Sequence, residues 1–187
     1  MADNDFGYTS WGMDWVRLAQ PLKMSKPEPM LPRARSIAGN GLVRTEIENT
    51  MVRAMIHRGS EASVTYLELT PLTAETIAAI AQLIPADTLT LTDEHRVAIA
   101  EHGINIAPRI ARADCSCRAR NERCLHYLAT CYALARQVDE TPWLALELQG
   151  FRSGGSTAGT AGEQSHPARW TPLSALDPAS YFEVPVA

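Results

Sequence analysis

The spacing of hydrophobic positions predicts a short amphipathic helix near the start of the chain, followed by a linker. Apolar residues recur at i, i+4 and i+7 in the stretch SWGMDWVRLAQPL, with Ser10 as the cap and Pro21 as the stop of the helix. These apolar positions are Trp11, Trp15 and Leu18. The next residues, 23–33, contain three prolines, which argue against a helix interior or a central strand.

Strand-like alternation begins at residue 34. Four short runs rich in β-branched residues, separated by turn residues, predict a three- or four-stranded antiparallel meander. The runs are ARSIA (34–38), LVRTEIE (42–48), MVRAMIHR (51–58) and ASVTYLELT (62–70). One buried sheet face accounts for the alternation, so we expect a scaffold with His57 on its surface.

Helical spacing returns in two further segments. The stretch TAETIAAIAQLI is capped at Thr73 and repeats its apolar residues with a helical period. A second helix is expected from about Thr92 to Gly103. We interpret its polar residues as a solvated face rather than a second metal site; they are Glu94, His95, Glu101 and His102. Helices that follow strands favour an α+β fold with a small antiparallel sheet.

The composition is that of a globular protein with one hydrophobic core. Apolar residues make up 45% of the 187 positions and charged residues 20%. The start MADNDFGYTSW has acidic residues where a secretion signal carries positive charge. The longest apolar run is far short of the ~20 residues that cross a bilayer. We therefore expect a cytoplasmic protein without a membrane segment.

The hydrophobic period is lost beyond Gly150. The stretch FRSGGSTAGTAGEQSHPARW is rich in Gly, Ser, Thr and Ala, which is typical of a flexible linker. Spaced aromatic residues return after it, at Trp170, Tyr181 and Phe182. We interpret them as a docking segment, and the pattern leaves open whether it docks on its own domain or on a partner protein.

Four residues with metal-binding side chains crowd into the stretch DCSCRARNERCLHY, residues 114–127. They are Cys115, Cys117, Cys124 and His126. Four nitrogen and sulfur donors fill the tetrahedral sphere of a structural zinc ion and leave no position open for a substrate. The first pair can point to one side of an extended segment, and the second pair can converge if it straddles the start of a helix.

Other roles for the cysteines have less support. A disulfide within Cys-x-Cys would close a strained loop, and a redox centre of that kind would not need a second Cys-x-His pair nearby. The remaining cysteine, Cys131, falls on the same face of the expected helix as Cys124. We interpret Cys131 as a small hydrophobic residue packed beneath the metal site.

Positive charge gathers at this cluster although the whole chain has a net charge of -4. Between residues 108 and 123 five arginines stand against two acidic residues. Arg118, Arg120 and Arg123 lie in the loop between the ligand pairs, where they are candidates for contacts to nucleic-acid phosphates. The alternative is a solvated, charged loop without a partner.

At these residues the chain resembles the SWIM zinc finger family, whose pattern is Cys-x-Cys followed at variable distance by Cys-x-His. The resemblance covers roughly residues 6–152 and is similar in style to actinobacterial, hence bacterial, members. It implies a C-terminal ββα-type zinc knuckle, binding to DNA or RNA, and a partner such as a Swi/Snf-type helicase-like ATPase. Family members commonly carry Pro-Asp-Trp after the second cysteine and a lysine before the histidine, where this chain has RARNER and Leu125.

The expected organisation has four parts. An N-terminal helix with a proline-rich linker (1–32) precedes an α+β scaffold (33–107). The SWIM-like zinc finger with its following helices (108–152) comes next, and a tail (153–187) ends the chain.

The sequence favours a non-catalytic function. The expected metal sphere is saturated, and the chain has neither a glycine-rich phosphate loop nor a recognisable Ser/His/Asp or Cys/His set. We therefore predict a zinc-binding accessory protein without a small-molecule substrate. Two hypotheses remain, namely binding of nucleic acid, above all DNA, through the finger, and a role as an adaptor that docks on a larger ATPase.

Overall fold

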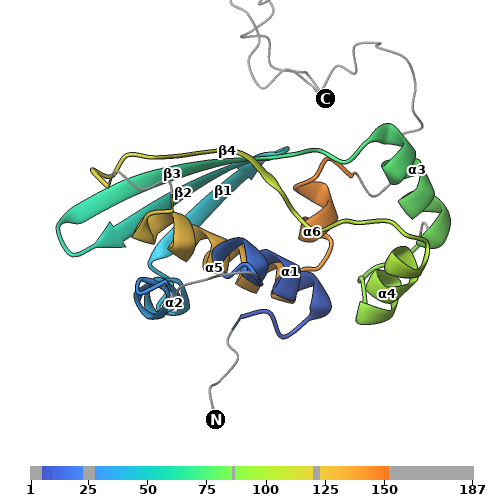
Figure 1. The fold of residues 1–187 in the computed structure, drawn as a ribbon, viewed down its shortest axis with the longest axis horizontal. Helices are drawn as coiled ribbons and strands as arrows, with labels where there is room; N and C mark the ends of the chain where they lie inside the picture. Colours follow the sequence, from blue (N-terminus) through green and yellow to red (C-terminus); the bar gives the residue numbers. More distant parts are fainter. Residues whose placement is uncertain (1–5, 23–27, 86, 120–122, 152–187) are drawn as a thin grey trace, which may run out of the picture. The chain divides into compact units, whose positions relative to one another are not determined.

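A computed structural model describes residues 6–22, 28–85, 87–119 and 123–151. In this part of the chain, six helices accompany one four-stranded antiparallel sheet and leave one of its faces uncovered (Figure 1). The helices are α1 (Ser10–Ala19), α2 (Leu31–Gly39), α3 (Ala74–Leu83), α4 (Asp93–Glu101), α5 (Leu125–Glu140) and α6 (Leu144–Glu147). The strands are β1 (Val43–Glu48), β2 (Met51–Arg58), β3 (Glu61–Leu69) and β4 (Ile110–Cys115). The predicted α+β class with a small antiparallel sheet is confirmed.

The sheet has the order β1-β2-β3-β4, and its two faces differ in burial. Alternate residues of β2 and β3 point to the core, because side chains along a strand project to opposite faces. The buried set is Val52, Ala54, Ile56, Thr65, Leu67 and Leu69. Helix α5 lies along this face, with α1 and α2 beside it (Figure 1). The predicted sheet-surface position of His57 is confirmed, since it is exposed on the other face.

The predicted strand at residues 34–38 is wrong, because these residues belong to α2. Pro32 occupies the first turn of this helix, where its missing N–H is tolerated, and the buried residues Ala34, Ile37 and Ala38 have helical spacing. The helix also begins at Leu31, within the predicted linker. The fourth strand is instead β4, which pairs with β3.

One of the two predicted helix caps is confirmed, and so is the predicted start of a helix near Thr92. The Thr73 hydroxyl accepts a hydrogen bond from the backbone N–H of Thr76 at the start of α3, and Thr92 caps α4. The cap predicted at Ser10 is displaced by one residue. Thr9 caps α1 instead, and its hydroxyl accepts a hydrogen bond from the backbone N–H of Gly12.

Helix α1 is held against α5 by apolar burial and by one carboxylate. Trp11 and Trp15 are almost fully buried. Asp139, near the end of α5, accepts hydrogen bonds from the backbone N–H of Gly7 at 2.6 Å and from the backbone and side chain of Thr9 at 2.9 and 2.7 Å. The N-terminal helix therefore shares its core with an element about 130 residues later in the chain.

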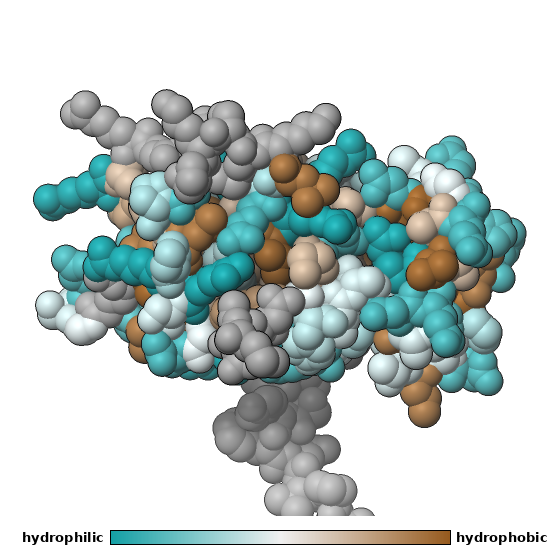
Figure 2. Space-filling view, turned by 60° about the horizontal axis from the view of Figure 1, so that its bottom comes forward, coloured by the Kyte–Doolittle hydropathy of each residue, from teal (hydrophilic) through white to brown (hydrophobic). Residues whose placement is uncertain are grey.

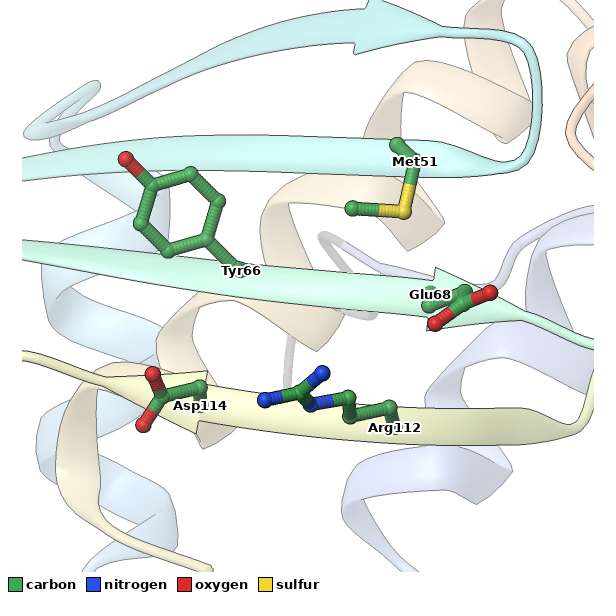
Figure 3. A pocket seen from close by; sticks show the side chains of 5 residues that line it. All are labelled: Met51, Tyr66, Glu68, Arg112 and Asp114. Atoms are coloured by element: carbon green, nitrogen blue, oxygen red, sulfur yellow. The ribbon is translucent and has the colours of Figure 1, made fainter.

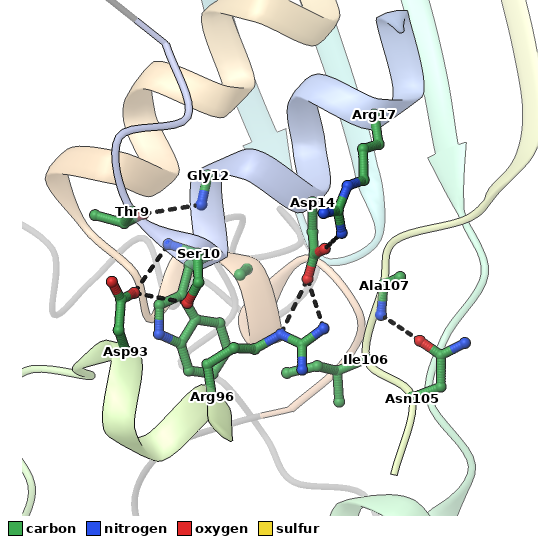
Figure 4. Close-up of polar contacts among 12 residues, drawn as sticks. Thr9, Ser10, Gly12, Asp14, Arg17, Asp93, Arg96, Asn105, Ile106 and Ala107 are labelled. Atoms are coloured by element: carbon green, nitrogen blue, oxygen red, sulfur yellow. Dashed lines mark hydrogen bonds and ion pairs between the residues drawn. The ribbon is translucent and has the colours of Figure 1, made fainter. Parts of the chain in front are cut away.

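Polar contacts also join α1 to α4 (Figure 4). The buried Asp14 carboxylate accepts two hydrogen bonds from the Arg96 guanidinium, at 3.0 and 2.7 Å, and a third from Arg17. Asp93 accepts from both the backbone and the hydroxyl of Ser10. A buried carboxylate needs such partners, because an unpaired buried charge is costly.

The described residues all belong to one compact unit. The finer boundaries expected at residues 32, 107 and 152 stay predictions. Within the described ranges no helix is both long enough and apolar enough to span a bilayer. On the face seen in Figure 2, hydrophobic side chains are scattered among hydrophilic ones.

Candidate metal centre

The four predicted ligands come together at one corner of the sheet. The ligand atoms of Cys115, Cys117, Cys124 and His126 all lie within 4.8 Å of one another. A tetrahedral ion with metal–ligand bonds of about 2.0–2.3 Å requires separations of about 3.5–3.8 Å between its ligand atoms. The 3.8 Å between the Cys115 Sγ and the His126 Nδ1 already fits this value. The four predicted ligand residues are thus brought together, and the group can hold a metal ion.

The sheet positions the first ligand pair. Cys115 ends β4 opposite Thr65 of β3, whose hydroxyl lies 3.4 Å from the Cys115 Sγ. The next residue, Ser116, is locked to Val64 by two hydrogen bonds of 2.9 Å, one from its backbone N–H and one to its hydroxyl. Cys117 follows in a bend, so both thiols are carried by a backbone that the sheet holds.

The start of α5 positions the second ligand pair. Cys124 is the N-cap residue, with an extended backbone, and its Sγ accepts from the backbone N–H of Tyr127 at 3.4 Å. His126 lies in the first turn. The predicted helix start between Cys124 and His126 is confirmed, and the positive end of the helix dipole favours a thiolate there.

Two thiols of the cluster differ in acidity. Burial raises the pKa of Cys124 to about 12. The pKa of Cys117 is lowered, because hydrogen bonds from the backbone of Ala119 and from the neighbouring thiols outweigh the opposing effect of burial. A metal ligand must be the thiolate, so an ion that binds here has to displace a proton from Cys124.

Cys131 lies in the hydrophobic core on α5 and is fully buried, as predicted. Burial raises the pKa of its thiol to about 12. Among the described residues, the candidate metal cluster is the Cys3His group, and Cys131 is outside it. Its place is that of a small hydrophobic residue.

The raised pKa of Cys131 predicts a loss of stability at alkaline pH. The folded protein keeps the thiol neutral up to about pH 12, whereas an unfolded cysteine ionises near about pH 8.5. Its contribution is therefore fully present below about pH 8.5 and falls at up to about 1.4 kcal/mol per pH unit above it. Urea denaturation between pH 8 and pH 10.5 should show a steeper fall for the native chain than for Cys131→Ala. Equal slopes would contradict the assignment.

The structure separates the roles of the arginines. Arg118 is exposed in the bend that follows Cys117. Arg123 instead reaches inward, where its Nη2 donates to the carbonyl oxygen of Ala19 at 2.7 Å and its guanidinium lies 5.9 Å from the centre of the Tyr127 ring. This contact could not be predicted from local sequence, because Ala19 is 104 residues away.

Several predicted residues lie outside the described ranges. They are Arg120 of the loop and the tail aromatics Trp170, Tyr181 and Phe182.

Among the polar residues predicted for the second helix, His95 lies at the start of α4. Its Nδ1 accepts a hydrogen bond from the backbone N–H of Thr92. This contact gives His95 a capping role.

The open face of the sheet carries a shallow depression (Figure 3). Its lining consists of Met51, Tyr66, Glu68, Arg112 and Asp114. Met51 and Tyr66 are each 43% exposed although both are large apolar side chains. Sequence reasoning treated this face only as scaffold, since charged and apolar residues mix along each strand.

Comparisons with protein-family models, with curated proteins and with solved structures gave no match to this chain. The fold and the site define the class as an α+β protein with a candidate Cys3His metal centre. The resemblance to the SWIM family stays a prediction.

Proposed function

We propose that this protein is a non-catalytic, zinc-stabilised accessory protein that binds nucleic acid, above all DNA, through the knuckle (residues 115–126). The observation that carries the proposal is the convergence of four ligand atoms within 4.8 Å at the junction of β4 and α5. A site with four protein ligands has no open position, which is the arrangement of structural zinc rather than of catalytic zinc.

The donor set supports zinc over other divalent ions. Three thiol ligands and one imidazole are soft to borderline donors, whereas magnesium and calcium require oxygen. Both ligand pairs are held by regular structure, one by β4 and one by α5, so a tetrahedral ion would join the sheet to the central helix. Binding energy at such a site acts as folding energy.

Arg118 supports the nucleic-acid part of the proposal. It is exposed one residue after the ligand Cys117, on a backbone that a bound ion would fix. A guanidinium held in place can meet a phosphate with less loss of side-chain entropy than one on a mobile loop. By sequence Arg120 extends the same loop.

The open sheet face supports a second candidate function. Met51 and Tyr66 expose apolar surface between charged residues, a mixture found at protein interfaces, and methionine adapts well to different partners. This observation favours an adaptor that docks on a larger machine, such as a Swi/Snf-type helicase-like ATPase.

Fluorescence anisotropy of labelled single- and double-stranded DNA and RNA, titrated with the zinc-loaded protein at two salt concentrations, tests the proposal. We expect salt-sensitive binding, and we expect Arg118→Ala to weaken it and to reduce the salt slope by about 0.7–0.9 for the lost phosphate contact. Arg136→Ala is the matched control, because Arg136 is exposed on α5 and pairs with Glu140.

Binding that is absent for every probe would contradict the nucleic-acid proposal. That result would favour the adaptor function instead. The double variant Met51→Ser/Tyr66→Ser, which removes the exposed apolar surface of the sheet, is the variant that tests it.

A further inference from the structure

Helix α1 is fastened to α5 at both of its ends. Its N-terminal end is held by Asp139 near the end of α5, through the three hydrogen bonds to Gly7 and the cap residue Thr9. Its last residue, Ala19, is held by Arg123, which directly precedes α5 and its cap. The first fastening is far along α5 from the metal centre, and the second is next to it.

The Arg123 contact suits the end of a helix. The last carbonyls of a helix lack partners within the helix, and the negative end of the dipole attracts a cation. The Arg123 Nη2 supplies both the donor and the charge at 2.7 Å from the Ala19 oxygen. The stack on the Tyr127 ring, from the first turn of α5, sets the direction of the guanidinium.

Arg123 is joined by one peptide bond to the metal ligand Cys124. Any displacement of Cys124 therefore moves the base of the Arg123 side chain, and with it the contact to Ala19. The ligands on the other side, Cys115 and Cys117, belong to the strand end and its bend. A bound ion is what would tie these two parts of the backbone together at the knuckle.

We propose that Arg123 couples metal occupancy of the knuckle to helix α1. A bound ion fixes Cys124 against the end of β4, and this places the Arg123 guanidinium on the Ala19 carbonyl. The contact to Arg123 then holds the last turn of α1 in place. Without the ion the last turn of α1 loosens, while Asp139 still holds the N-terminal end. The coupling rests on the metal-binding part of the proposed function and not on nucleic-acid binding.

Residue-resolved amide exchange of the full chain tests this coupling, with Zn²⁺ as the probe and zinc content measured in every sample. Comparing the zinc-loaded with the chelated protein, we expect the exchange of the Gln20 amide, which donates to Val16 in the last turn, to rise by about tenfold or more. The amide of Gly7, bound by Asp139, should rise much less.

Arg123→Gln separates coupling from general loss of structure. This variant should keep one zinc per chain and still show the faster exchange of the last turn of α1, and Arg123→Lys should restore part of the protection. Arg118→Gln is the matched control from the same loop and should leave α1 unchanged. Unchanged exchange in zinc-loaded Arg123→Gln, or in the chelated protein after zinc had been bound, would overturn the coupling alone. Absence of zinc binding to the native chain would overturn the coupling together with the proposed metal centre.

Discussion

Cys124→Ser is expected to abolish stoichiometric zinc binding and to lower the midpoint of thermal unfolding by roughly 10 °C or more. Apparent binding free energies of structural zinc sites are about 10–16 kcal/mol at neutral pH, which is as large as the whole stability of an ordinary domain. A loss of even about 4 kcal/mol shifts the midpoint of a protein of this size by roughly 10 °C. Cys124 is nearly fully buried at the start of α5, where a serine hydroxyl can still cap the helix, so the loss reports the missing metal ligand and not a missing cap.

Zinc analysis, circular dichroism and thermal melting together measure this effect. A chelator added to the native chain should reproduce the melting behaviour of Cys124→Ser. Arg118→Ala is the control, because it changes an exposed residue of the same loop and should keep both the zinc and the melting temperature. Circular dichroism and melting that do not respond to the chelator would show that the cluster is not a structural metal site.

The metal ligands were predictable because their signal is local. The Cys-x-Cys and Cys-x-His pairs need only an extended segment and a helix start to converge, and both were readable from short stretches of sequence. The Thr73 cap and the helix start near Thr92 were likewise predictable from the residues that follow them. What brings the two ligand pairs to one point is the pairing of β4 with β3, in which Cys115 lies opposite a residue 50 positions earlier.

The secondary-structure and contact predictions failed where residues distant in sequence decide the structure. Residues 34–38 were predicted as a strand because they precede the strand-like runs, but alanine and arginine are good helix formers. Burial of Ala34, Ile37 and Ala38 against α5 selects the helix. An extended segment at Cys115 was expected, but its pairing with β3 was not, because the residues of β4 are mostly exposed and show no regular apolar alternation. The inward contact of Arg123 could not be predicted, since its sequence context is that of a charged loop.

Gly12→Ala is expected to destabilise the protein by about 2–4 kcal/mol, although alanine is intrinsically the better helix former by about 1 kcal/mol. Gly12 is buried in α1, and a Cβ at this position would overlap the carboxylate of Asp139. The carboxylate has little freedom to move, because it accepts three hydrogen bonds from the start of α1. Relief of the overlap would break bonds to a buried charge, which costs more than the helix propensity returns.

Urea denaturation of a set of variants identifies the cause of this loss. Gly39→Ala, in α2, is the matched control, because a Cβ there meets only the Phe6 ring at 3.8 Å, an ordinary contact, and should be neutral or slightly stabilising. Asp139→Ala should itself cost about 3 kcal/mol, since it leaves the amides of Gly7 and Thr9 without their acceptor. In the double variant the Cβ of residue 12 no longer meets a carboxylate, so the combined loss should be smaller than the sum of the two single losses. Additive losses would mean that Gly12 is required for a reason other than its close approach to Asp139.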